Sequence, residues 1–257
     1  MKQWASIYAV LLLAGCAAPA PQEPPAGMSP QVSGAELQPG NYWRYAVHDG
    51  YTKLPRDTVE YRVSGIRGDA VAFTVLNGDR ESTELYARDG NWLQRPATNM
   101  QTFTYTPPYP AFVFPLAPGK TWRSRVTATD PADGRSFPVS IEGTVLGWER
   151  VRVPAGEFDT LKVRRNVFLD YFQQGVRGQS VIVEHEWYAP ALKQAARRET
   201  ISQYLSFYQV GDVAPEFIPV RGRGGGRMGR DGRDDGSSPR YIRDDWLVYE
   251  LVSYSVR

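Results

Sequence analysis

The sequence predicts an all-β fold, either a strongly curved antiparallel sheet of the half-barrel type or a sandwich-like body. The chain has 257 residues and is rich in the aromatic residues that strands favour, with 15 Tyr, 10 Phe and 7 Trp. It also contains 24 Gly and 20 Pro, which supply turns. Apolar and polar residues alternate over short segments instead of recurring at helical spacing, and this period is typical of half-buried strands.

The first sixteen residues are typical of a secretion signal and not of a folded element. Lys2 precedes an apolar run that ends in small residues, and Cys16 is the only cysteine of the chain. The apolar stretch 7–14 is too short to cross a bilayer, which takes about 20 residues. We therefore expect residues 1–15 to be a signal peptide, and we exclude disulfide bonds as a source of stability.

The tetrapeptide Leu13-Ala14-Gly15-Cys16 resembles the lipobox of bacterial lipoproteins, in which the cysteine thiol receives a diacylglycerol. An ordinary cleaved signal peptide is the alternative. The resemblance implies three fatty acyl chains, such as palmitate, on Cys16, and several chains hold a protein firmly in a membrane. Ala17 differs from the Asp that resembles an inner-membrane retention signal, so we expect the periplasmic side of the bacterial outer membrane.

Residues 16–40 form a proline-rich segment behind the expected anchor. Six prolines lie between Pro19 and Pro39, among small and polar residues. Such a composition buries too little apolar surface to order itself, so we expect a disordered tether. The remainder, 41–257, is expected to be a single β-rich domain that is long enough to bury a substantial core.

The first half of this body predicts an antiparallel meander. In segment 42–48, Trp43, Tyr45 and Val47 fall on one face of a strand. Asn77-Gly78 is a strong hairpin signal, because a type I′ turn needs positive φ at two successive residues. The expected strands are 42–48, 58–63, 71–75, 80–87 and 92–95.

The second half continues the pattern after a proline-rich and aromatic loop over 96–110, which is either a stiff connection or a lip over a groove. Gly143 lies on the same strand face as Ile141 and Val145, and a glycine there predicts a bulge or a bend. From about 215 to 240 the chain loses its apolar residues, so we expect a disordered Arg/Gly insert. The expected strands are 111–114, 121–128, 137–153, 158–171, 180–188, 197–208 and 245–256.

Three motifs of the second half carry a further resemblance. They are Phe114-Pro115-Leu116-x-x-Gly119-Lys120-x-Trp122, Val151-x-Val153-Pro154-Ala155-Gly156-x-Phe158-x-x-x-Lys162-Val163, and Trp187-Tyr188-Ala189-Pro190. Together they resemble a recurring signature of uncharacterised bacterial envelope lipoproteins. The resemblance implies a curved antiparallel sheet similar to the half-barrels that handle lipoproteins and other lipids. It implies no catalytic residue.

On strand 180–188 the alternation predicts that Val183, His185 and Trp187 face the core, while Glu184 and Glu186 face solvent. We expect the concave face of the sheet to hold an apolar ligand or a partner segment. The same inward side chains serve equally well as a filled core. The expected lining residues are Trp43, Tyr61, Phe73, Phe137, Val183, His185 and Trp187.

Few residues indicate catalysis. The chain has two histidines and contains no nucleophile elbow, no zinc-protease motif and no phosphate-binding glycine loop. Glu184 and Glu186 have a spacing that a glycosidase pair could use, but outward strand carboxylates are more often solvated. We therefore expect a non-enzymatic protein without a metal or cofactor, and a hydrolase of unknown class is the third alternative.

The net charge of +2 provides no global field to attract nucleic acid, so we expect no nucleic-acid partner. The local excess of arginine in the insert could contact lipid phosphates or lipopolysaccharide, or it could be an idle loop. A structural or interaction component of an envelope complex, using this loop and exposed strand edges, is the second functional hypothesis. The sequence determines no oligomeric state. The candidate arginines are Arg221, Arg223, Arg227, Arg230 and Arg233.

Overall fold

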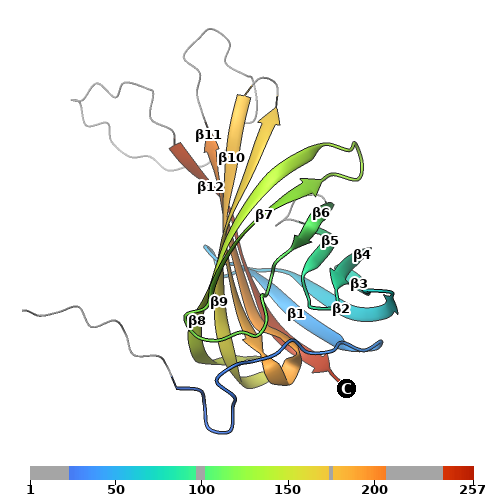
Figure 1. Ribbon diagram of the computed structural model, residues 1–257, viewed down its shortest axis with the longest axis vertical. Helices are drawn as coiled ribbons and strands as arrows, with labels where there is room; N and C mark the ends of the chain where they lie inside the picture. The colour runs from blue at the N-terminus through green and yellow to red at the C-terminus, as the bar shows by residue number, and fades with distance from the viewer. Residues whose placement is uncertain (1–22, 97–101, 174–175, 207–239) are drawn as a thin grey trace, which may run out of the picture.

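The protein is a closed antiparallel barrel. The computed structural model describes residues 23–96, 102–173, 176–206 and 240–257, in which twelve strands follow one another around the barrel (Figure 1). The all-β prediction is confirmed. The half-barrel and sandwich alternatives are replaced by full closure, because β1 pairs with β2 on one side and with β12 on the other. No helix in the described ranges is long and apolar enough to cross a membrane.

The strands run up and down, and each pairs with its neighbour in sequence. A single 3₁₀ turn, η1 (Pro190–Leu192), interrupts them between β10 and β11 among the described residues. The strands are β1 (Tyr42–Asp49), β2 (Pro55–Arg67), β3 (Ala70–Asn77), β4 (Arg80–Ala87), β5 (Trp92–Pro96), β6 (Thr102–Tyr109), β7 (Thr121–Thr129), β8 (Ser136–Val153), β9 (Gly156–Gln173), β10 (Val176–Ala189), β11 (Gln194–Ser206) and β12 (Arg240–Ser255).

The predicted hairpins of the first half are present. Asn77 and Arg80 pair across the β3–β4 turn, and Gly78 has a φ of 57°, the left-handed conformation that its lack of a Cβ permits. The predicted loop over 96–110 differs, because much of it is strand β6. Its prolines Pro107 and Pro108 have no N–H, and β6 pairs with β7 only over Thr104 to Thr106.

Aromatic side chains fill the barrel. Twelve strands enclose a wider interior than the eight whose side chains just fill a small barrel, so large rings are needed to occupy it. Trp43, Tyr45 and Phe73 are fully buried. Trp92 and Tyr109 are register partners on the neighbouring strands β5 and β6, and their rings stack with centroids 4.1 Å apart. The interior is therefore largely a packed core.

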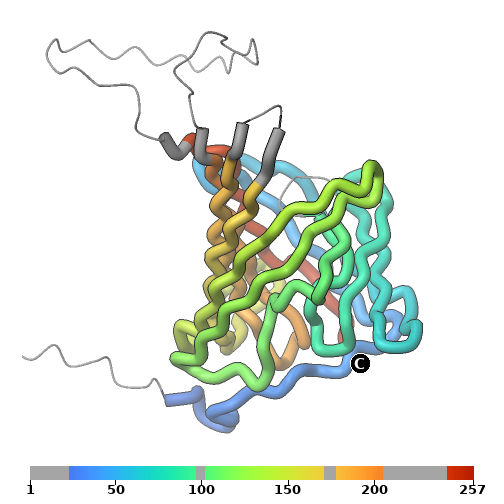
Figure 2. Tube along the Cα trace, turned by 45° about the horizontal axis from the view of Figure 1, so that its top comes forward, coloured from blue at the N-terminus to red at the C-terminus, as the bar shows by residue number. Residues whose placement is uncertain are grey.

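Residues 23–40, which we call the strap, run along one end of the barrel (Figure 2). Val32 and Leu116 form an isolated bridge with two backbone hydrogen bonds, of 2.8 and 2.7 Å. Lys193 Nζ donates to the backbone carbonyl of Glu36 at 3.0 Å. The prediction of a disordered linker is therefore wrong for this part of 16–40, because Val32 and its neighbours find apolar partners on the barrel.

The strap defines one end of the barrel, which we call the strap end. The β4–β5 turn, the segment 110–120 and η1 lie at the same end, since β4, β6 and β10 finish there. The opposite end, where β11 finishes and β12 begins, we call the insert end. The predicted Arg/Gly insert, 215–240, joins these two strands and lies outside the described residues except at Arg240.

Gly143 does not form the predicted bulge; instead, it allows the Trp122 ring to pack closely against the strand. The β7–β8 register passes through Trp122 and Gly143 without a shift. A Cβ at Gly143 would overlap the indole ring of Trp122, so the glycine makes room for that ring. The register shift of β8 against β9 lies a few residues later, between Val145 and Gly147.

Candidate functional site

The side chains of β10 point in the opposite sense to the prediction. Glu184 and Glu186 face the barrel interior and are 9% and 5% exposed. Val183 and His185 face outward, so the prediction that they line the concave face is wrong. The physical reason is a buried cation, Arg165, on the neighbouring strand β9, where it lies directly opposite Glu184.

Arg165 is the residue that draws the two glutamates inward. It lies in phase with four buried aliphatic residues of β9, and its own exposure is 0%. A buried guanidinium is strongly destabilising unless acidic partners and hydrogen bonds compensate it. The alternation of β9 therefore already indicated an internal ion pair, although the prediction for β10 placed both glutamates in solvent. The four aliphatic residues are Leu161, Val163, Val167 and Leu169.

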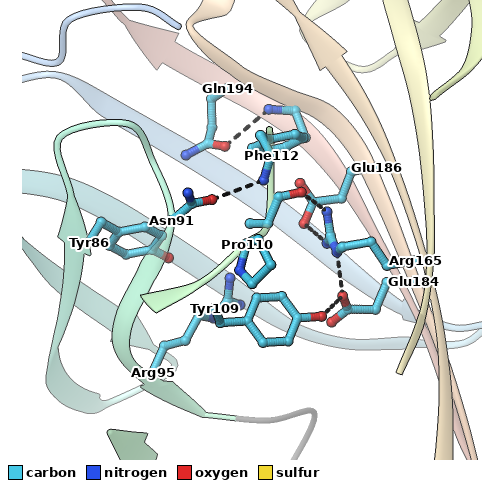
Figure 3. Close-up of polar contacts among 12 residues, drawn as sticks. Tyr86, Asn91, Arg95, Tyr109, Pro110, Phe112, Arg165, Glu184, Glu186 and Gln194 are labelled. Carbon is cyan, nitrogen blue, oxygen red and sulfur yellow. Dashed lines mark hydrogen bonds and ion pairs between the residues drawn. The ribbon is translucent and has the colours of Figure 1, made fainter. Parts of the chain in front are cut away.

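Arg165 is held by three acceptors (Figure 3). Its Nε donates to Glu184 Oε2 at 2.7 Å, and its Nη2 donates to Glu186 Oε1 at 2.8 Å. Its Nη1 donates to the backbone carbonyl of Ala111 at 2.7 Å. Tyr109 donates its hydroxyl to Glu184 Oε2 at 2.8 Å, from across the barrel. These bonds connect β6, β9 and β10 through the core.

A second ion pair, between Glu84 of β4 and Arg95 of β5, lies inside the barrel. The hydroxyl of Tyr86 donates to Glu84 Oε2 at 2.6 Å, and Arg95 Nε lies 3.7 Å from the same oxygen. The Arg95 guanidinium also lies over the Trp92 ring, 4.0 Å from its centroid. The Arg165 guanidinium lies 5.5 Å from the same ring centroid, so both cations contact Trp92.

Arg198 is the third internal cation, and it has no salt bridge to any residue that the structure describes within 4.0 Å. It is 7% exposed, and its guanidinium lies over Tyr45 and Tyr61, 5.1 and 5.2 Å from their centroids. Its Nε has no hydrogen-bond partner, and neither has the Nε of Arg95. Two buried guanidinium groups thus keep unused donors.

The charges of the site are fixed at neutral pH. Burial alone would raise the pKa of Glu186, but the attraction of Arg165 and Arg198 lowers it below its usual 4.5. Burial raises the pKa of Tyr109 well above 10, and the neighbouring Glu184 adds to this shift. Glu186 is therefore an anion and Tyr109 a neutral donor, and neither is poised for proton transfer near pH 7.

Two small cavities adjoin this ionic cluster. The larger, which we call the strap-end cavity, has a volume of about 30 Å³. The second is about 20 Å³ and has mostly apolar walls, with Glu184 at one side. A buried water molecule needs about 10–15 Å³, so each cavity holds only one or two such groups. Neither is the open apolar pocket that the ligand hypothesis predicted. Polar and charged residues at the strap-end cavity are Arg88, Asp89, Arg95, Glu186, Lys193, Gln194 and Arg198.

The other predicted lining residues divide between the two faces of the barrel wall. Trp43, Tyr61 and Phe73 are buried inside, and Phe73 borders the strap-end cavity. Phe137 is half-buried and meets the ring of Phe103, 5.9 Å away. Trp187 lies on the outer face, and its prediction as an inner residue is wrong.

Trp187 is buried outside the barrel by two long cationic side chains. Lys162 Nζ lies 4.5 Å from its ring centroid, and the Arg197 guanidinium lies 5.1 Å away. His185 lies beside it, with 6.1 Å between ring centroids, and burial lowers the pKa of this histidine. The prediction placed Trp187 inside because a large apolar ring is normally buried. Here the ring is buried on the outer face, beneath the two cationic side chains.

Several predicted residues lie outside the described ranges. These are the lipidation candidate Cys16 and the arginines of the insert: Arg221, Arg223, Arg227, Arg230 and Arg233. Within the described part of the chain, no three His, Cys, Asp or Glu side chains form a group that could hold a metal ion.

Comparison with known proteins gives distant structural likenesses. No protein family and no curated protein matches this sequence. A provisionally named lipoprotein from Parabacteroides distasonis has 12% identity and a TM-score of 0.45, and the match covers 87% of this chain and 99% of the other. A provisionally named exported protein with a YmcC-like fold from Bacteroides fragilis has 14% identity, a TM-score of 0.45 and the same coverage.

The hypothetical lipoprotein YmcC from Escherichia coli is also similar. It has 11% identity and a TM-score of 0.39, and the match covers 63% of this chain and 76% of the other. All three TM-scores lie below 0.5, so these likenesses assign neither a family nor a function to this chain.

Proposed function

We propose that this chain is a lipid-anchored protein of the bacterial envelope that binds a ligand at the strap end of its barrel and leaves it chemically unchanged. The observation that carries the binding role is the strap-end cavity, where two buried guanidinium groups, Arg95 and Arg198, keep unused donors. Unused donors on buried cations are destabilising, and a bound acceptor would compensate them.

The strap supports the placement of this cavity near the membrane. Six residues, 17–22, lie between Cys16 and position 23, where the strap begins, so the chain makes seven residue-to-residue steps. A fully extended chain spans at most about 3.5 Å per residue, so the tether allows roughly 25 Å. An acylated Cys16 therefore keeps the strap end of the barrel close to the bilayer, and Ala17 favours the periplasmic side of the outer membrane.

The charge arrangement supports a binding role over a catalytic one. Glu184 and Glu186, the pair considered for glycoside hydrolysis, both bond to Arg165 inside the barrel. Glu184 also accepts the hydroxyl of Tyr109. Retaining and inverting glycosidases need one carboxyl free to act as an acid or nucleophile on the sugar, and these two are engaged and enclosed.

The anchor is tested by mass spectrometry of the full-length protein extracted from its native membrane. We expect the mature chain to begin at Cys16 and to carry acyl chains. The Cys16→Ser variant should carry none and should leave the outer-membrane fraction. Outer-membrane retention of the unacylated variant would overturn the anchor, and a mature chain that begins elsewhere would do the same.

Ligand binding is tested on the same extracted protein by native mass spectrometry. We expect a bound species in addition to the acylated chain, and its proportion should fall in the Arg198→Gln variant. The matched control is Arg197→Gln, which removes the neighbouring arginine on the outer face. An unchanged proportion of the species in Arg198→Gln would place the binding elsewhere.

One observation favours a second candidate, an interaction component of an envelope complex. β6 and β7 pair over only three residues, so Thr121 to Val126 of β7 have register partners on β8 alone among the described residues. An incompletely paired strand edge can accept an added strand from a partner. Crosslinking in the native envelope should then capture a partner at Arg123, which points outward and is largely exposed. A proline at Ser124 should abolish the crosslink.

A further inference from the structure

The strap-end cavity carries an excess of positive charge. Four cationic side chains border it, and two carboxylates oppose them. Of the carboxylates, Glu186 is already bonded to Arg165. Of the two inner cations, Arg95 is paired with Glu84, whose carboxylate oxygen lies 3.7 Å from its Nε, while Arg198 has no salt bridge among the described residues. Neither Nε has a hydrogen-bond partner. Arg198 is therefore the buried cation of the cavity that lacks an anion.

The size of the cavity limits what that anion can be. A volume of about 30 Å³ has room for roughly two water-sized groups, which suits the two oxygens of a carboxylate. Guanidinium groups present forked N–H donors, a geometry that suits a carboxylate. The inner end of the cavity is thus a site for one carboxylate.

The walls of the cavity are aromatic. Six aromatic residues border it, and the walls continue to the strap through Leu37. Phe112 and Phe114 lie 5.8 Å apart by ring centroids, and Tyr188 contacts both. On the outer side, the cavity is bordered by the exposed residues Arg88 and Asp89, so it reaches the surface of the barrel. A ligand's carboxylate can lie inside while its apolar part contacts these rings.

We propose that the strap-end cavity binds the carboxylate of an amphiphile, a molecule with one carboxylate on an apolar chain. Arg198 and Arg95 hold the carboxylate, and Phe112, Phe114 and Leu37 contact the chain. This proposal rests on the proposed binding function and names its ligand class.

The test measures the melting temperature of the full-length wild-type protein in detergent with a series of pure compounds. The compounds are acetate, hexanoate, decanoate, hexanol and inorganic phosphate. We expect decanoate at about 100 times its dissociation constant to raise the melting temperature by roughly 5–10 °C. Hexanoate should bind more weakly and acetate more weakly still, while hexanol and phosphate should have no effect.

Two variants assign the effect to the cavity. Arg198→Gln should weaken decanoate binding roughly 10- to 100-fold, the factor expected for loss of a charged hydrogen bond. Arg197→Gln, its neighbour on the outer face, should bind like the wild type. If Arg198→Gln does not fold, Phe114→Ala at the half-exposed rim replaces it and should weaken decanoate binding more than acetate binding.

Specific outcomes overturn the proposal. They are no response of the wild type to any carboxylate, equal binding of acetate and decanoate, or a response to phosphate alone. An unaltered affinity in the Arg198→Gln variant would also overturn it. These results are distinguishable from a failure of the proposed function. A different species that co-purifies with the wild type and is lost in Arg198→Gln would keep the binding role while refuting the carboxylate.

Discussion

Removal of the central cation should destabilise the barrel more than removal of an ordinary polar residue. Arg165 is fully buried and bonds to Glu184, Glu186 and the carbonyl of Ala111. Substitution of Arg165 by Met keeps much of the side-chain volume but leaves two buried carboxylates without their cation. Breaking a buried ion pair in this way costs about 3–5 kcal/mol. For a domain of this size, the melting temperature should fall by roughly 10–15 °C.

The pH dependence of stability should change sign in this variant. In the wild type, the pKa of Glu186 lies below its ordinary 4.5, so its contribution to stability is present above pH 4.5 and is lost as the pH falls through the folded-state pKa. In Arg165→Met, burial of Glu186 dominates and raises its pKa. The variant should therefore regain stability between about pH 7 and pH 5, a range in which this group leaves the stability of the wild type unchanged.

Urea denaturation from pH 5 to pH 8 measures both effects, provided that unfolding is two-state. The control is the triple variant Arg165→Met/Glu184→Gln/Glu186→Gln, which removes the charges together and should recover most of the lost free energy of unfolding. A loss under about 1 kcal/mol in Arg165→Met would refute the argument that this cation holds the interior together. The same refutation would follow from a triple variant that is no more stable than the single one.

Four further substitutions test the packing. Gly143→Ala should lower the free energy of unfolding by about 1–3 kcal/mol, because its new methyl overlaps the Trp122 ring, while Gly65→Ala, whose Cβ meets nothing within 4 Å, should cost less than about 1 kcal/mol in thermal denaturation. Leu116→Ala should cost about 2–5 kcal/mol and should speed limited proteolysis of the strap, since the residue is fully buried beneath it. His185→Gln on the outer face should change stability by about 0.5 kcal/mol or less, and a loss above 2 kcal/mol would contradict its outward placement.

Local patterns were sufficient for most strands. Alternation located β1 and β3, and the Asn77-Gly78 hairpin signal located β4 as the return strand. These features depend on residues within a few positions of each other, so the sequence displays them directly. Closure of the sheet depends on the pairing of β1 with β12, about 200 residues away, and no local pattern reports it.

The candidate site could be predicted only in part. Trp43, Tyr61 and Phe73 are apolar enough to be assigned to the interior from alternation alone. Glu184 and Glu186 were assigned to solvent because ionised carboxylates are rarely buried without a partner. Their partner is Arg165 on the neighbouring strand. Arg165 falls on the same strand face as the apolar residues of β9, and this position in the sequence could have indicated a buried ion pair.

By itself, the sequence determined that the body is built of antiparallel strands and that Cys16 is the candidate for an anchor, because both depend on short-range pattern. Only the tertiary structure decided that the sheet closes, that part of the tether packs as a strap, and which face of β10 is inside. These three depend on contacts between distant residues: β1 with β12, Val32 with Leu116, and the glutamates with Arg165. A buried ion pair reverses the ordinary preference of charged side chains for water, and that reversal requires both partners to be seen in space.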